Sequence, residues 1–72
     1  MKRYAIIVED AGNNLAAYVP DLPGCVATAD SREELNQLIR ETIEMHIEGM
    51  IEDGLAVPEP KSRVDYVDVT AA

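Results

Sequence analysis

One cysteine and one histidine, Cys25 and His46, are the side chains of this chain best suited to nucleophilic or general-base chemistry near neutral pH. A cysteine nucleophile needs an activating base and an electropositive setting, whereas the chain carries 14 acidic and only 6 basic residues. We therefore interpret Cys25 as a small packed hydrophobe. His46 has no second histidine to work with, so it is predicted to be a core or interface residue rather than a ligand or general base. No catalytic residue is predicted.

The composition also argues against bound metals and cofactors. One cysteine and one histidine are too few soft ligands for a structural zinc site, and a disulfide within the chain is impossible. A chain of 72 residues with no Trp and no Phe has a small core, and such domains often need a partner subunit. We therefore expect a homodimer or a tetramer, with no cofactor and no metal.

The net charge of −8 restricts the possible partners. It repels phosphate backbones, so the chain is not expected to bind nucleic acid by itself, and it favours a basic protein partner. The start of the chain lacks the features of a signal peptide, and no apolar stretch is long enough to span a membrane. The expected location is the cytoplasm, without membrane attachment.

Three strands are predicted in the first half of the chain. Tyr4–Val8 and Leu15–Val19 are rich in strand-forming residues and flank a short turn cluster, which favours an antiparallel hairpin. Val19-Pro20-Asp21-Leu22-Pro23-Gly24-Cys25 follows, in which Pro20 ends the second strand because it cannot donate to a sheet. Pro23 and Gly24 suit the two central positions of a type II turn, which leads into a third strand, Cys25–Ala29.

A single amphipathic helix is predicted after these strands. Ser31-Arg32-Glu33-Glu34 fits a capping box, and Gly54 suits a left-handed stop after Asp53. The predicted apolar face carries Leu35, Leu38, Ile39, Thr42, Ile43, His46, Ile47 and Met50. The opposite face carries Glu41, Glu44, Glu48 and Glu52, and we interpret it as solvated, with a cation or partner contact as the alternative.

A fourth strand is predicted at Arg63–Val69, beyond Pro58 and Pro60. A right-handed crossover through the helix would place it parallel to the first strand and beside it. The predicted fold is therefore α+β, with the order β-β-β-α-β and the spatial strand order 3-2-1-4. Because apolar residues lie on both faces of this strand, it is expected to be buried between subunits. The predicted oligomer interface comprises Val64, Tyr66, Val67 and Val69.

Four features together resemble the N-terminal domain of the HicB family of antitoxins. They are the opening strand ending in Val8-Glu9-Asp10, the proline-rich turn segment, the capping box, and the sequence from Glu52-Asp53-Gly54 to Val57-Pro58-Glu59-Pro60. The resemblance implies a degenerate ribonuclease H-like fold and a cytoplasmic protein. It also implies a toxin partner of the HicA type, a small basic protein that cleaves RNA. Residues 1–72 are expected to form one HicB-like domain, without the C-terminal DNA-binding domain of many family members.

The implied function is to bind and neutralise the toxin, and the alternatives are a stand-alone oligomer without a toxin and, more remotely, a weak metal-dependent hydrolase. Glu9 and Asp10 could suggest a surviving nuclease site, but we interpret them as solvated turn acids because no inward-facing acid is predicted in the first strand.

Leu22 either folds under the sheet or anchors a partner. We assign the partner contact to the turn, at Tyr18, Asp21, Leu22 and Pro23.

Overall fold

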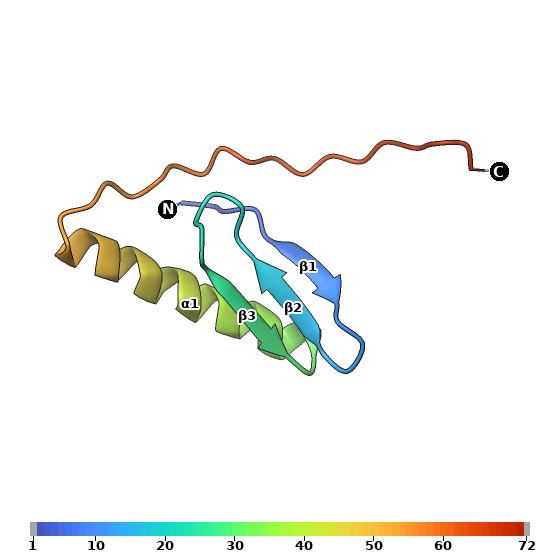
Figure 1. Cartoon of the computed structure of the whole chain (residues 1–72), viewed down its shortest axis with the longest axis horizontal. Coiled ribbons are helices and arrows are strands. Elements are labelled where there is room, and N and C mark those ends of the chain that lie inside the picture. Colours follow the sequence, from blue (N-terminus) through green and yellow to red (C-terminus); the bar gives the residue numbers. More distant parts are fainter. Residues whose placement is uncertain (1, 72) are drawn as a thin grey trace.

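A computed structural model describes residues 2–71 of the chain (Figure 1). Its elements follow the order β1 (Ile7–Asp10), β2 (Leu15–Tyr18), β3 (Val26–Ala29) and α1 (Arg32–Glu52). The predicted three strands and one helix are thus confirmed, although β1 begins three residues later than expected. The domain boundaries expected at residues 1 and 72 lie outside the described residues.

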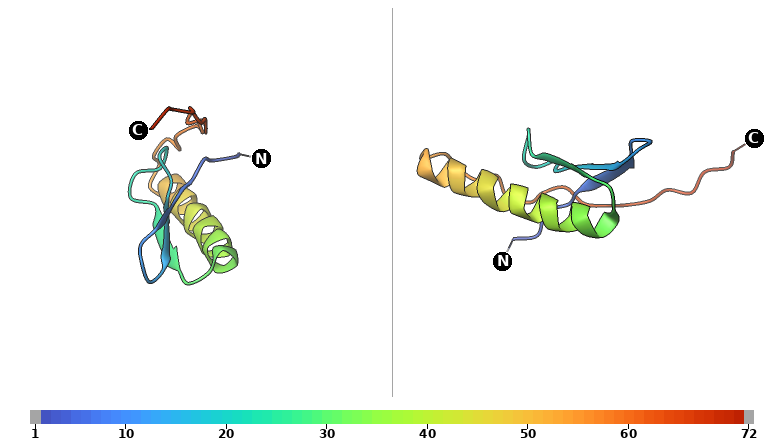
Figure 2. Two further views of the ribbon diagram at one scale, coloured as in Figure 1. Left: turned by 90° about the vertical axis from the view of Figure 1, so that its right-hand side faces the viewer. Right: turned by 90° about the horizontal axis from the view of Figure 1, so that it is seen from below.

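The sheet is an antiparallel meander of order β1-β2-β3. Opposite residues lie on one face of a sheet, so the pairs Ile7↔Tyr18 and Tyr18↔Val26 form a row across its outer face. The pairs Val8↔Ala17 and Ala17↔Ala27 form the corresponding row on the inner face, which α1 covers. In Figure 2 the helix lies along one side of the sheet, while the other side is uncovered.

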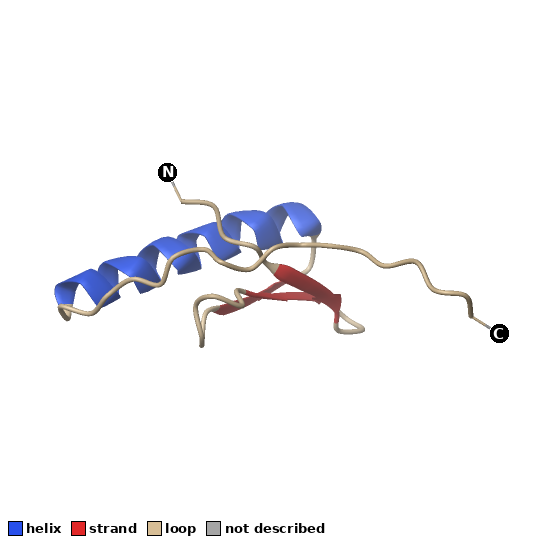
Figure 3. Cartoon of the chain, turned by 90° about the horizontal axis from the view of Figure 1, so that it is seen from above, coloured by secondary structure: helices blue, strands red, loops and turns tan. Residues whose placement is uncertain are grey.

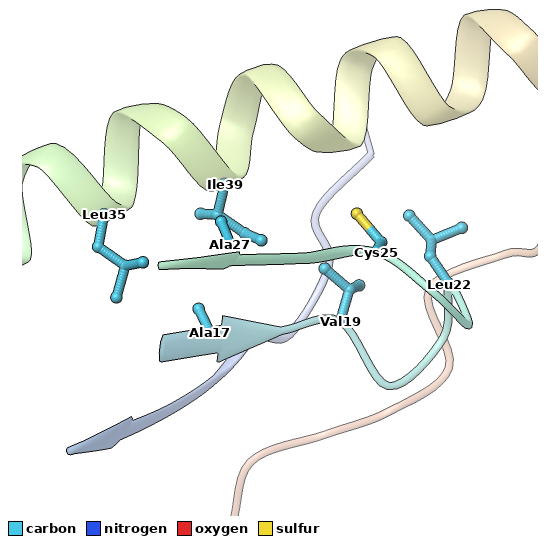
Figure 4. Close-up of a cluster of buried hydrophobic side chains, with 7 residues drawn as sticks. All are labelled: Ala17, Val19, Leu22, Cys25, Ala27, Leu35 and Ile39. Carbon is cyan, nitrogen blue, oxygen red and sulfur yellow. The ribbon is translucent and has the colours of Figure 1, made fainter. Parts of the chain in front are cut away.

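The core fills the space between α1 and the inner face of the sheet (Figure 4). Its buried members are Ala17, Val19, Leu22, Cys25, Ala27, Leu35 and Ile39. The helix packs on β2 and β3, whereas Tyr4 and Ile6, which precede β1, and Val8 within it are only partly buried. The core is therefore complete under β2 and β3 and thin beside β1.

The helix begins and ends at the capping residues that the sequence predicts. The Glu34 backbone N–H donates to Ser31 Oγ at 3.2 Å, which is one of the two bonds of the expected capping box. At the other end, Gly54 adopts a φ of 72°, a left-handed conformation that is nearly free of strain only for glycine. These caps give a helix of 21 residues, longer than the sheet it covers.

The proline-rich segment forms the predicted turn. The Cys25 backbone N–H donates to the Leu22 carbonyl at 3.1 Å, and Gly24 has a φ of 84°, as a type II turn requires at that position. The Leu22 N–H in turn donates to the Val19 carbonyl, also at 3.1 Å. Two consecutive turns therefore fold Leu22 back under the sheet, where its side chain is completely buried.

The predicted fourth strand is wrong for the single chain. Residues 55–71, all within the described part of the chain, contain neither helix nor strand, so Arg63–Val69 does not pair beside β1 and the strand order 3-2-1-4 is not formed. The local sequence favours extended backbone, but a strand also needs a neighbour to complete its hydrogen bonds. Only the β-β-β-α part of the predicted order is confirmed, and the ribonuclease H-like relationship stays a prediction.

The C-terminal tail makes the molecule elongated. It runs from the end of α1 past the N-terminal segment and continues beyond the sheet (Figures 1 and 3). The radius of gyration is 14.3 Å, whereas a compact domain of this length has one of about 11 Å. The longest dimension, 51 Å, likewise reflects the projecting tail.

Candidate partner-binding surfaces

The first half of the tail is fixed to the body of the domain by a group of polar contacts, which we call the latch. Asp21 in the β2–β3 turn accepts hydrogen bonds from the backbone N–H groups of Lys61 and Ser62 and from the Ser62 hydroxyl, each at 2.9 Å. The Tyr4 hydroxyl donates to the Pro58 carbonyl at 2.6 Å. A salt bridge of 2.8 Å joins Lys2 to Glu59. The latch therefore joins three segments that are distant in sequence.

The electrostatics of the latch follow from these bonds. The donors of Ser62 and Lys61 stabilise the ionised carboxylate, so they hold the pKa of Asp21 below its ordinary value of 3.8. The hydrogen bond to Glu59 raises the pKa of the Lys2 ammonium group. Because the side chains of Lys2 and Glu59 are both exposed to solvent, their ion pair contributes little stability. The three bonds to Asp21 hold the tail at Lys61 and Ser62.

Beyond the latch, residues 63–71 form a segment that we call the arm. Every residue of the arm is exposed. Its four large apolar side chains are uncovered to an unusual degree, with exposed fractions of 59% for Val64, 87% for Tyr66, 82% for Val67 and 79% for Val69. A run of exposed large hydrophobic residues is typical of a segment that binds another surface. The predicted interface residues are thus exposed in the single chain, and their role in an oligomer stays a prediction.

A second apolar surface is the row Ile7–Tyr18–Val26 across the outer face of the sheet. Val26 is 61% exposed and Tyr18 is 42% exposed, and no other element covers them within the described residues. The neighbouring row on the same face, Glu9–Ala16–Thr28, is more polar. The outer face therefore has an apolar end next to the β2–β3 turn, where Pro23 is also exposed.

A third surface is an open groove of about 790 Å³ between the N-terminal segment and α1. It lies where the helix, packed on β2 and β3, leaves the side of β1 uncovered. The apolar lining consists of Tyr4, Ile6, Ile39, Ile43 and Ile47. Lys2, Arg40 and Glu44 add charged groups to the lining, and Asn36 adds an amide, so the groove is lined by both apolar and charged side chains.

Cys25 and His46, the two side chains best suited to catalysis, lie in different environments. Burial raises the pKa of the Cys25 thiol, which opposes formation of the reactive thiolate, and Cys25 is 1% exposed within the core as predicted. His46 is half-buried on the helix. Across residues 2–71, no group of three or more His, Cys, Asp or Glu side chains is arranged to hold a metal ion.

The residues predicted to contact a partner have different environments. Tyr18 and Pro23 are exposed and remain predicted contact residues. Asp21 binds the tail of its own chain, a role that the sequence did not indicate. Leu22 is 0% exposed, so its side chain belongs to the core and the idea of an exposed leucine anchor is wrong. Val26 and Ile7 were not predicted as contact residues, because their position beside Tyr18 depends on the strand register.

The comparison with protein families decides the relationship. The sequence model of HicB-like antitoxins of bacterial toxin–antitoxin systems matches residues 4–71. The chain belongs to this HicB-like antitoxin family. The matched residues include the whole arm and every residue of the latch except Lys2, so both segments belong to the part of the chain that fits the family.

Individual relatives agree with the HicB-like assignment. An uncharacterized 14.9 kDa protein of Haemophilus phage HP1 is 34% identical over 90% of this chain, and the chain spans about half, 49%, of that relative's length. A UPF0150 protein of Archaeoglobus fulgidus is 38% identical over 72% of this chain, and the match covers 80% of that protein. A UPF0150 protein of Helicobacter pylori is 36% identical over 81% of this chain, and the match covers 81% of that protein. No solved structure gives a significant match.

No helix in the described part of this HicB-like chain is long and apolar enough to cross a membrane.

Proposed function

We propose that this HicB-like chain is a cytoplasmic, non-enzymatic antitoxin that binds and neutralises a HicA-type toxin, a small basic protein that cleaves RNA. The observation that carries the proposal is the family match over residues 4–71. The net charge of −8 supports it, because an acidic protein attracts a basic partner, and this attraction increases the rate at which the two proteins associate.

The proposed contact surface is the apolar end of the outer sheet face, at Tyr18 and Val26, with Pro23 beside it. Tyr18 and Val26 are opposite each other on β2 and β3. Pro23 is exposed in the connecting segment, where backbone hydrogen bonds close two turns. A rigid surface with an aromatic residue favours binding, because little conformational entropy is lost. The exposed acids of α1, Glu41, Glu44 and Glu48, would add long-range attraction for a basic toxin.

Calorimetry with a HicA-type toxin encoded beside the gene for this chain tests the contact surface. Val26→Asp should weaken binding by an order of magnitude or more, because it places a charge in the apolar row. The control is Thr28→Asp, which adds the same charge to the same strand and face but outside the row. If the toxin binds both variants equally, this surface is not the interface. If the toxin does not bind the unaltered chain, the proposal as a whole is wrong.

A second candidate function is a stand-alone oligomer without a toxin, and the exposed apolar arm favours it. We propose in either case that copies of the chain self-associate as a dimer or tetramer through Val64, Tyr66, Val67 and Val69. Two copies with eight excess negative charges each repel one another, so salt should strengthen the association by screening the repulsion. Light scattering that gives the monomer mass of 7.9 kDa at micromolar concentration, at low and at high salt, would exclude self-association.

A further inference from the structure

The geometry points to reciprocal arm exchange between two copies of the chain. We infer that the arm of one copy adds as a strand to the free edge of β1 in the second copy, above the groove between the N-terminal segment and α1. This inference rests on the self-association proposed above, and it specifies the surface that receives the arm.

The arm has the properties of a strand without a neighbour. Successive side chains of a strand point to opposite faces, so Val64 and Tyr66 would lie on one face and Val67 and Val69 on the other. All four are more than half exposed in the single chain. A strand that is apolar on both faces needs an apolar neighbour on each side of the sheet that it joins.

The edge of β1 offers such neighbours on both sides. On the helix side, Ile6 and Ile43 line the open groove, which is not filled by any element among the described residues. On the outer side, Ile7 lies at the edge and is followed by Tyr18. Because β1 is an outer strand of the sheet, its outward backbone groups are also available for pairing with another chain.

The latch makes the second copy a better source of this strand than the chain itself. Pro58 is bonded to Tyr4, which also lines the groove, but the tail then continues to Asp21 in the β2–β3 turn and leaves from there. No arm residue, all of which lie in the described part of the chain, lines this groove or pairs with β1 in the single chain. Figures 1 and 2 show that the arm instead continues beyond the sheet, in position to reach another molecule.

The charges of the two surfaces are also compatible. The arm carries Asp65 and Asp68 between its apolar residues, and the groove is lined by the basic residues Lys2 and Arg40. An arm docked there would place carboxylates near these cations. Reciprocal exchange would repeat each contact twice across a two-fold axis, as is usual for homodimers.

Paramagnetic relaxation in a mixed sample tests the inference. One copy carries Cys25→Ala and Thr70→Cys and has no isotope label. A nitroxide attached at residue 70 lies next to the apolar run Val64–Val69 and replaces none of its residues. This copy is mixed with the ¹⁵N-labelled unaltered chain. Exchange predicts strong broadening of the amide signals of Ile6–Glu9 in the labelled copy, and much weaker broadening of the β3 signals of Val26–Ala29.

The variant Tyr66→Asp/Val67→Asp, carrying the same nitroxide, should lose the broadening of the β1 signals. The control is Arg63→Asp/Ala71→Asp, which adds two carboxylates outside the run Val64–Val69 and also removes one cation, yet should retain most of the broadening. A dimer mass by light scattering without broadening at β1 would leave self-association intact but overturn arm exchange. A monomer mass would overturn both.

A second sample tests whether the arm folds onto its own sheet. One chain carries both the ¹⁵N label and the nitroxide, and it is diluted into an excess of the unlabelled, unaltered chain. If the β1 signals are still broadened in this sample, the arm lies on the sheet of its own chain, and exchange is overturned.

Discussion

Asp21 and Ser62 lie 41 positions apart in the sequence, and the Asp21 carboxylate accepts hydrogen bonds from both the backbone N–H and the hydroxyl of Ser62, each at 2.9 Å. This relationship connects the β2–β3 turn to the C-terminal tail. It divides the tail into a bound part, which ends at Ser62, and the exposed arm. The Asp21 carboxylate is therefore the last contact that holds the tail before the arm begins.

Asp21→Asn should release the tail while leaving the core intact. The three bonds to Lys61 and Ser62 use both carboxylate oxygens. Asparagine keeps only one oxygen, which is a weaker acceptor, so the set of three bonds is broken. Trypsin should then cut after Lys61 and Arg63 several times faster, with no change in the melting temperature beyond a few degrees. The control is Asp30→Asn, which makes the same substitution at an exposed aspartate just before the helix. Equal cleavage rates in both variants would mean that Asp21 does not hold the tail.

The part of the latch that Asp21 forms should open in acid. Because the pKa of Asp21 in the folded chain lies below its ordinary value of 3.8, the three hydrogen bonds that its carboxylate accepts are fully present above pH 3.8. They are lost as the pH falls through the lower pKa of the folded state, because the protonated carboxyl accepts more weakly. The amide chemical shifts of Lys61 and Ser62 should follow this titration, and in Asp21→Asn they should not. Shifts that change only near neutral pH would contradict the assignment.

Leu22→Ala should destabilise the domain by about 2–5 kcal/mol, as is typical when a fully buried leucine is truncated. Leu55→Ala is a matched control, since Leu55 is 56% exposed and its truncation should cost no more than about 0.5 kcal/mol. Urea unfolding at one fixed protein concentration measures both values. If the two variants unfold at the same urea concentration, Leu22 is not part of the core in solution.

The isolated chain should not bind duplex DNA near physiological salt. Its net charge of −8 opposes the phosphate backbone, and release of counterions, which drives most protein–DNA binding, requires a basic surface. A gel shift with the promoter fragment of its own gene, at low micromolar protein, should show no retarded band. A specific band that competitor DNA does not remove would contradict this prediction.

The features predicted correctly from the sequence are those that short segments encode. Ser31 and Gly54 delimit the helix through local hydrogen bonding and backbone conformation, and Pro23-Gly24 specifies its turn within four residues. The HicB-like resemblance likewise rested on short motifs in a fixed order, and the family match confirms it.

The features that were wrong or missed depend on contacts between distant segments. Arg63–Val69 has the composition of a strand, but whether it forms one depends on a neighbour that the single chain does not supply. Leu22 was assigned to a contact surface because its sequence does not reveal that two successive turns direct it inward. The bond between Asp21 and Ser62 has no local signal, because neither residue type indicates a partner 41 positions away.

Inhibition of toxin-catalysed RNA cleavage by the purified chain tests the antitoxin function most directly. A fixed amount of a HicA-type toxin, encoded beside the gene for this chain, is titrated with the chain, and the rate of RNA cleavage is measured at each ratio. If the chain is the antitoxin, the rate falls in proportion to the added chain and reaches the background at a fixed stoichiometry, and Val26→Asp requires a large excess. Cleavage that continues undiminished at a large excess of the folded chain would contradict the assigned function.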